Sequence, residues 1–186
     1  RLSARAGVKE AIGRAAGDLV REGETIYLDS GSTCLAIARA VRGMDLRVVT
    51  NSLDVLEELC DASSIVLHGV GGSFRRDARS FIGPVAVQAI RTFHFDRAFI
   101  GTSGVTVEGV FSAQNAIESD VKRAVIGQAA RTVVVTDSSK IGQTAFSIFA
   151  RPEQVQMVVT DSSTAAQRLR DAASFEVSLV SSEEDS

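Results

Sequence analysis

Short apolar runs alternate with longer segments of helical spacing along most of this chain. The apolar runs are rich in β-branched residues and are apolar at nearly every position, which is typical of strands buried on both faces. They lie at 25–29, 46–50, 64–70, 97–101, 132–137, 156–161 and 175–180. The segments of helical spacing lie at 4–20, 32–42, 52–61, 83–92, 115–130 and 163–172. This alternation predicts an α/β fold, a doubly wound and mostly parallel sheet with helices on both faces.

The remaining segments are short and irregular. We expect loops or a small β excursion at 104–114 and 138–155, and a disordered tail at 181–186, where the sequence reads SSEEDS. A length of 186 residues with 45% hydrophobic residues predicts one domain with a substantial core, residues 1–186. Since the chain starts in a helix-like segment without an initiating Met, we expect it to be part of a longer protein.

Composition narrows the classes of function. A formal net charge of −3 does not supply the basic surface that binding to a phosphate backbone requires, so we expect no DNA binding by this segment itself. No apolar run approaches the ~20 residues of a membrane span, and the N-terminus does not follow the order of a signal peptide. These features predict a cytoplasmic location without a membrane partner.

The cysteines and histidines point to packing rather than to chemistry. Cys34 and Cys60 lie in apolar segments of helical spacing, which predicts reduced, buried thiols. His68 and His94 have no ligand spacing to each other or to a cysteine. We therefore expect neither a metal nor a cofactor.

The first predicted strand ends in an unusual segment, Asp29-Ser-Gly-Ser-Thr33, just before a helix. Ser32 or Thr33 is expected to cap that helix, whose free N–H groups and partial positive charge favour a phosphate or a carboxylate. Gly31 allows the backbone to approach such a ligand closely.

Other predicted strands also end in small polar residues: Thr50-Asn51-Ser52, Gly71-Gly72, Gly101-Thr102-Ser103-Gly104 and Asp137-Ser138-Ser139-Lys140. In an open parallel sheet, ligands bind outside the carboxyl ends of the strands, near the point where the strand order reverses. The sequence therefore predicts one polar site for a small molecule at this edge of the sheet.

The residue types at that edge favour an anionic ligand. Lys122 and Lys140 supply positive charge, and Arg75, Arg76 and Arg79 crowd one loop, which suits a phosphorylated molecule. Carboxylates and amides hold sugar hydroxyls well, and the candidates for this role are Asp29, Asn51, Asn115 and Glu118.

Taken in order, these segments resemble the C-terminal sensor domain of the DeoR family of bacterial transcription regulators. The resemblance spans about residues 7–165 and rests on the whole series of motifs. The series comprises Asp29 to Thr33, Thr50-Asn51, Gly71-Gly72 with Arg75, Ser80 to Pro84, Asp96 to Gly101, Glu118 with Lys122, Asp137 to Lys140, and Val159 to Asp161.

The resemblance implies a fold similar to ribose-5-phosphate isomerase, glucosamine-6-phosphate deaminase and CoA-transferase domains, used as a sensor. It also implies an upstream winged helix-turn-helix domain, which lies outside this chain, and a homo-oligomer. By motif match it places a phosphorylated sugar or a related metabolite among these residues: Asp29, Gly31, Ser32, Thr33, Thr50, Asn51, Gly71, Gly72, Arg75, Gly101, Thr102, Ser103, Gly104, Glu118, Lys122, Asp137 and Lys140.

The leading prediction is an effector-binding domain that is not an enzyme and that controls DNA binding through the helix at 4–20 and the loop at 72–82. An alternative is a sugar-phosphate isomerase, whose candidate base is Glu118 with Lys122 one helical turn later. That pair is also open to a simpler interpretation, a surface salt bridge. A third possibility is a purely structural oligomerisation module, which would bind no small molecule.

Overall fold

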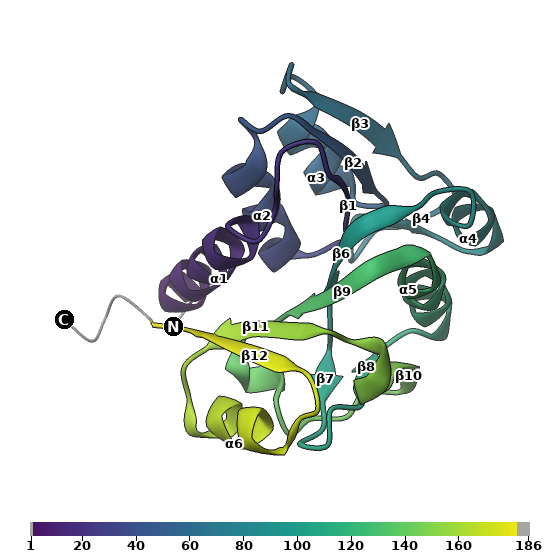
Figure 1. Ribbon diagram of the computed structural model, residues 1–186. Helices are drawn as coiled ribbons and strands as arrows, with labels where there is room; N and C mark the ends of the chain where they lie inside the picture. Colours follow the sequence, from purple (N-terminus) through teal and green to yellow (C-terminus); the bar gives the residue numbers. More distant parts are fainter. Residues whose placement is uncertain (1, 182–186) are drawn as a thin grey trace.

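The computed structural model describes residues 2–181, with side chains from residue 6 onward, and Figure 1 shows its arrangement. The predicted tail therefore falls, apart from Ser181, outside the described residues. The helices are α1 (Leu2–Gly17), α2 (Ser32–Val41), α3 (Leu53–Leu59), α4 (Pro84–Ile90), α5 (Ala116–Gln128) and α6 (Thr164–Ala172). Each corresponds to a segment predicted from helical spacing, with ends shifted by a few residues.

The main sheet in the described part of the chain has seven strands, all parallel, in the order β12-β11-β9-β6-β1-β2-β3. These strands are β1 (Thr25–Leu28), β2 (Leu46–Thr50), β3 (Ile65–Gly69), β6 (Phe95–Gly101), β9 (Ala129–Val135), β11 (Met157–Asp161) and β12 (Glu176–Val180). The chain leaves β1 toward β2 and β3, and then returns to place β6 on the other side of β1. The strand order thus reverses between β1 and β6, and the doubly wound fold is confirmed.

Two hydrophobic cores cover the two faces of the sheet. Successive side chains of a strand point to opposite faces, so Leu28 packs with α1, α2 and α3, while Tyr27 packs with α4, α5 and α6. The same alternation separates Val133 from Val134 in β9. Helices on both faces explain why these strands are apolar at nearly every position.

The irregular segments form two small sheets. The predicted β excursion is β7 (Gly104–Val105), β8 (Phe111–Ala113) and β10 (Ser147–Ala150), in an antiparallel sheet. Two short 3₁₀ helices, Ser138–Lys140 and Pro152–Gln154, complete this region.

The loop expected at 72–82 is instead an antiparallel hairpin of β4 (Ser73–Arg75) and β5 (Ser80–Ile82). Its charged residues suggested a solvated loop, but the rings of Phe74 and Phe81 pack 5.2 Å apart and stabilise the strand pair. Arg79, with φ 46, turns the chain back into β5.

The prediction of two buried cysteines is wrong for Cys60. Cys34 lies in the first turn of α2 and is buried, whereas Cys60 is exposed. The helix α3 buries Val55 and Leu59 and ends there, so the next residue lies beyond its packed face.

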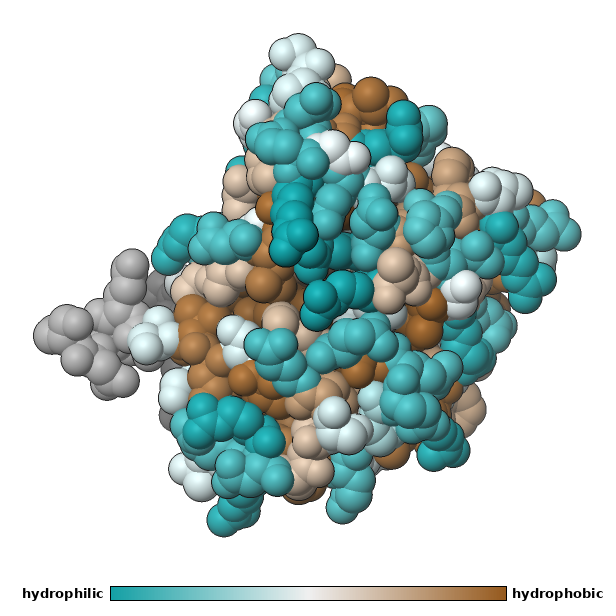
Figure 2. All heavy atoms as spheres, viewed as in Figure 1, coloured by the Kyte–Doolittle hydropathy of each residue, from teal (hydrophilic) through white to brown (hydrophobic). Residues whose placement is uncertain are grey.

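Figure 2 shows hydrophobic side chains exposed along the face that carries β11 and β12, between α1 and α6. β12 is an edge strand, and its residues Leu179 and Val180 are half-buried. None of the helices within residues 2–181 is both long and apolar enough to cross a membrane.

Candidate functional site

The start of α2 is built on a glycine. Gly31 is the N-cap residue with φ 109 and ψ 162, a backbone conformation that residues with a Cβ adopt with strain. Among the residues whose side chains the structure describes, none caps the first amides of α2, whereas Ser52 and Asn115 cap α3 and α5. The predicted capping role of Ser32 or Thr33 is therefore wrong: both lie inside the first turn, and the helix leaves its first N–H groups without a side-chain acceptor.

A cavity of about 150 Å³ lies at this point, at the carboxyl edge of the sheet. It is lined by Lys9, Ser30, Gly31, Ser32, Thr33, Cys34, Thr102, Val135, Thr136, Asp137 and Lys140. These residues come from α1, from the start of α2 and from the ends of β6 and β9. The structure thus brings together six of the predicted residues: Gly31, Ser32, Thr33, Thr102, Asp137 and Lys140.

Asp29 fixes the loop that begins the site. Its backbone N–H donates to Phe99 O at 3.1 Å, and its carboxylate accepts the N–H groups of Ser30 at 2.8 Å and Gly101 at 3.0 Å. These bonds tie the ends of β1 and β6 together at the switch point of the sheet. The side chain is only 2% exposed, so Asp29 fixes the loop at 30–33 from the buried side.

Lys122 of α5 neutralises Asp29. Its Nζ lies 2.5 Å from Asp29 Oδ2, donates to Gly101 O at 2.9 Å, and sits 5.4 Å from the centre of the Phe149 ring. Burial by itself lowers the pKa of the Lys122 ammonium, but the negative charges of Asp29 and Glu118 outweigh it, so the pKa is raised. Lys122 is therefore a buried cation that is already paired. The salt bridge with Glu118 is present, but it is largely buried and does not lie on the surface as the simpler interpretation had it.

Further ion pairs connect Lys122 to the hairpin of β4 and β5. Glu118 Oε1 lies 3.3 Å from Lys122 Nζ, and its other oxygen accepts a hydrogen bond from Arg75 at 2.7 Å. Arg75 is also paired with Asp77, at 2.8 Å. A chain of alternating charges thus runs from the switch point through α5 to β4.

Thr50 connects the ends of β2 and β1, and Asn51 holds the hairpin against the sheet. Thr50 Oγ1 donates to Leu28 O at 2.6 Å. Asn51 Oδ1 accepts from the Tyr27 hydroxyl at 2.8 Å, and Asn51 Nδ2 donates to Phe81 O at 2.9 Å. Both side chains are buried and bonded to protein groups. Their predicted contact with an effector stays a prediction, since neither lines the cavity.

The other predicted residues occupy connecting positions. Gly71 and Gly72 join β3 to β4, and Asn115 caps α5 by accepting from the N–H groups of Ile117 and Glu118. Ser103 donates its N–H to Ser112 O at 3.0 Å, and Gly104 begins β7. Their predicted roles in binding also stay untested.

Sequence reasoning missed Lys9, Ser30 and Thr136 as residues of the cavity. Lys9 lies in α1, far from the site in sequence, and its Nζ donates to Ser32 Oγ at 2.8 Å. No motif marks this lysine, because only the packing of α1 over α2 brings it to the loop.

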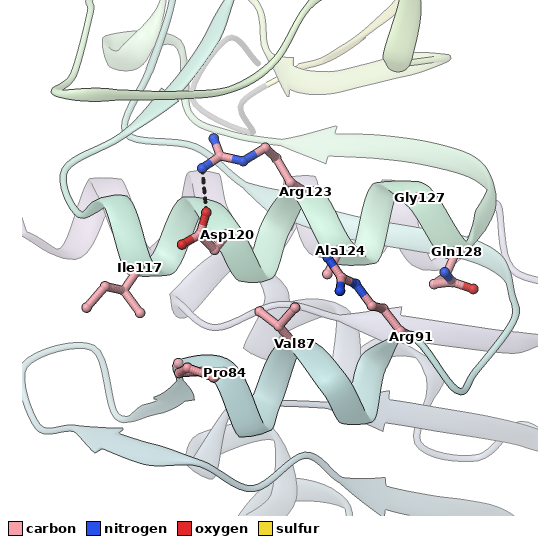
Figure 3. Close-up of a pocket in the computed structure, with 10 residues that line it drawn as sticks. Pro84, Val87, Arg91, Ile117, Asp120, Arg123, Ala124, Gly127 and Gln128 are labelled. Carbon is pink, nitrogen blue, oxygen red and sulfur yellow. Dashed lines mark hydrogen bonds and ion pairs between the residues drawn. The ribbon is translucent and has the colours of Figure 1, made fainter.

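A larger groove of about 690 Å³ lies between α4 and α5. Figure 3 shows Val87 of α4 and Arg91, the residue after α4, facing α5, where Arg123 is paired with Asp120 at 2.7 Å. Arg123 also donates to Ile148 O at 2.5 Å. None of the residues that line this groove follows the carboxyl end of a strand of the main sheet, so we place the candidate ligand site at the smaller cavity. Among the described residues, no group of three or more His, Cys, Asp or Glu side chains is arranged to hold a metal ion.

A parallel sheet with helices on both faces and a strand order that reverses at a switch point defines the class of doubly wound α/β domains. Within this class the chain belongs to the DeoR family, because the family model described as the DeoR C terminal sensor domain matches residues 5–162.

Curated relatives of this chain are transcription regulators. It is 35% identical over 158 residues to the transcriptional repressor AccR of Agrobacterium fabrum, covering 84% of this chain and 61% of that protein. It is 33% identical over 176 residues to the putative aga operon transcriptional repressor of Escherichia coli O157:H7, covering 93% of this chain and 65% of that protein. The chain thus spans less than two thirds of these relatives.

Solved structures with the same fold include enzymes and translation factors. The ribose 5-phosphate isomerase A of Methanocaldococcus jannaschii superposes with a TM-score of 0.52 at 18% sequence identity. The match covers 72% of this chain and 53% of the isomerase chain. eIF2B delta of Chaetomium thermophilum superposes with a TM-score of 0.61 at 15% sequence identity, and the match covers 81% of this chain and 54% of the eIF2B chain. Identities this low show the fold alone.

Proposed function

We propose that this chain is the effector-sensing domain of a transcription repressor of sugar metabolism, and that it binds a phosphorylated sugar or a related anionic metabolite. The cavity at the ends of β1, β6 and β9 carries this proposal. Its lining combines free helix amides, hydroxyls and the ammonium groups of Lys9 and Lys140, the donors that bind a phosphate. The names of the relatives, which include a lactose phosphotransferase system repressor of Streptococcus mutans, support the link to sugars.

The charges around the cavity support an anionic ligand. Lys122 is neutralised by Asp29 and Glu118, and Glu118 is also paired with Arg75. The cavity itself holds the ammonium groups of Lys9 and Lys140 and the carboxylate of Asp137. One positive charge is left without a balancing carboxylate in the lining, and this excess favours an anionic ligand such as a phosphate monoester.

The same geometry favours a sensor over an isomerase. An isomerase needs a carboxylate base within hydrogen-bond reach of the substrate carbon's proton. Glu118 and Lys122 are held in ion pairs, and neither lines the cavity. A sensor needs only the binding groups.

Occupancy of this cavity is proposed to control an upstream DNA-binding domain in the longer, cytoplasmic protein. HTH-type repressors stand among the relatives, such as GlcR of Bacillus subtilis, of which this chain covers 59%. A coupling free energy of about 1–3 kcal/mol would change the affinity for an operator roughly 5- to 150-fold, which is sufficient for a switch.

We also propose a homo-oligomer, supported by exposed apolar side chains. Phe146 is 82% exposed and Ile148, in β10, is 44% exposed, next to α5, where Ile117 is 48% exposed. Sedimentation of the domain and of its Phe146→Asp variant tests this proposal. A monomeric state of the unaltered domain at all accessible concentrations would contradict it.

Calorimetric titration of the domain with a panel of sugar phosphates, the unphosphorylated sugars and inorganic phosphate tests the main proposal, with product analysis of each mixture. We expect saturable binding of a sugar phosphate without conversion. Lys140→Glu should abolish this binding, whereas Arg168→Glu, the same change of charge on the exposed face of α6, should preserve it. Conversion of the sugar phosphate would identify an enzyme. If no sugar phosphate of the panel binds, the proposal of a phosphosugar sensor is contradicted.

A further inference from the structure

Lys9 reaches the cavity from a different part of the chain than the strand ends. It lies in α1, and its ammonium donates to Ser32 Oγ at 2.8 Å while lining the same cavity as Lys140. The side chain is half-buried. Lys9 is thus positioned to change its hydrogen-bond acceptor when an anion enters the cavity, from the neutral hydroxyl of Ser32 to a charged oxygen of the anion.

We propose that Lys9 is a ligand of the anionic group in this cavity and that it connects the occupied cavity to α1. This inference rests on the proposed function and adds to it both a binding residue and a route for the signal. The ammonium of Lys9 already makes a hydrogen bond to a neutral hydroxyl, and a phosphate oxygen adds the attraction between opposite charges to such a bond. Binding of the anion therefore strengthens the contact between α1 and the loop at 30–33.

The packing of α1 on α2 makes this connection stiff. A Cβ at Gly13 would stand 2.4 Å from Ala36 Cβ and 2.8 Å from Ala36 C, so at this point the two backbones are in direct contact. One turn later, a Cβ at Gly17 would stand 2.9 Å from Ala40 Cβ. Glu10 of α1 and Arg39 of α2 also form an ion pair of 2.6 Å across the two helices.

The consequence of this packing is a coupled movement. Packed helices without gaps shift as a unit between discrete arrangements, because their side chains are not continuously deformable. A shift of Lys9 and the start of α2 around an anion is therefore passed along α1 as a whole. The proposed effector signal leaves the site through this helix pair.

Titration with inorganic phosphate and with the tightest-binding sugar phosphate of the panel tests the role of Lys9. In Lys9→Gln we expect the affinity for both phosphates to fall about 10- to 100-fold, as for the loss of one charge-assisted hydrogen bond. Binding of the unphosphorylated parent sugar should not change. Arg21→Gln, which removes the same charge from an exposed position after α1, is the matched control and should bind as the unaltered domain does.

Hydrogen exchange of the amides at 10–17 tests the connection to α1. Saturation with the sugar phosphate should slow this exchange in the unaltered domain and leave it unchanged in Lys9→Gln at equal saturation. The inference is overturned if the unaltered domain binds phosphate and Lys9→Gln binds it as tightly as Arg21→Gln does. It is also overturned if hydrogen exchange in α1 does not respond to saturation of the unaltered domain. If the unaltered domain binds no phosphate at all, the proposed function itself fails, and the inference fails with it.

Discussion

Asp29, directly after β1, and Lys122, in α5, form a buried ion pair. Their atoms Oδ2 and Nζ lie 2.5 Å apart, and their side chains are only 2% and 4% exposed. The pair lies directly beneath the cavity loop, at the reversal of strand order between β1 and β6. Lys122 also bonds to Gly101 O, so that a single ammonium group joins α5 to both strand ends. The loop that lines the cavity is thus held by a buried ion pair that does not itself line the cavity.

Breaking this pair should destabilise the domain strongly. In Lys122→Met the Asp29 carboxylate stays buried without its cation, which we expect to lower the free energy of unfolding by about 3–5 kcal/mol. Adding Asp29→Asn should recover part of this loss, because it removes the unpaired charge. Urea denaturation followed by circular dichroism measures both effects.

The control for this experiment is an exposed ion pair of similar length. Arg39 and Glu10 lie 2.6 Å apart with side chains 49% and 38% exposed, so Arg39→Met should cost less than about 1 kcal/mol. Equal losses in Lys122→Met and Arg39→Met would contradict a special role of the buried pair.

The close approach of α1 and α2 predicts opposite effects for two Gly→Ala substitutions in one helix. At Gly13 a Cβ would press on backbone atoms of Ala36 and Ile37 at 2.8 and 3.0 Å, so Gly13→Ala should destabilise the domain. Overpacking costs about 1–3 kcal/mol, more than the ~1 kcal/mol that alanine gains in helix propensity. At Gly7 nothing lies within 4 Å, so Gly7→Ala should be neutral or stabilising by up to ~1 kcal/mol. Thermal unfolding of the two variants decides the matter, and a stabilised Gly13→Ala would show that the helices are not in contact.

The two cysteines should differ in reactivity. Cys34 is buried and its pKa is raised by burial and by the charge of Asp29, whereas Cys60 is exposed. With a colorimetric thiol reagent at neutral pH, we expect the native domain to react rapidly at Cys60 only and the unfolded chain to react at both. Cys60→Ser should then show no rapid reaction until it is unfolded. Rapid labelling of Cys34 in the native domain would contradict its burial.

Stability should fall in alkaline solution. Burial raises the pKa of the Cys34 thiol and of the Tyr27 hydroxyl, and ion pairing raises the pKa of Lys122 despite its burial. In each case the folded state holds the proton to a higher pH than the unfolded chain does. The stability that these groups contribute is therefore complete below their ordinary pKa values and is lost as the pH rises above them.

The expected loss begins near pH 9.0, the ordinary value for a cysteine, and steepens above 10.0, the ordinary value for a tyrosine. Each group contributes up to about 1.4 kcal/mol per pH unit. Urea denaturation from pH 7 to pH 11 measures the slope, and Cys34→Ala should move the onset upward by about one pH unit. A free energy of unfolding that stays constant between pH 9 and pH 11 would contradict these shifts.

The sequence by itself determined the fold class and the edge of the sheet where the smaller cavity lies. Apolar strands alternating with helices allow few arrangements other than a doubly wound parallel sheet, because strands buried on both faces need helices on both sides. Short polar segments such as Asp29 to Thr33 mark the carboxyl ends of those strands, and these ends meet at one edge of the sheet.

Only the tertiary structure decided which of these polar residues face the cavity. Asn51 and Asp29 have the same ligand-like chemistry in the sequence, but packing of the hairpin and of α5 turns them toward Tyr27 and Lys122. Lys9 carries no motif and reaches the cavity only because α1 packs on α2 at Gly13. Local patterns follow from the periodicity of a single element, whereas the partner of a long or charged side chain depends on contacts between elements distant in sequence.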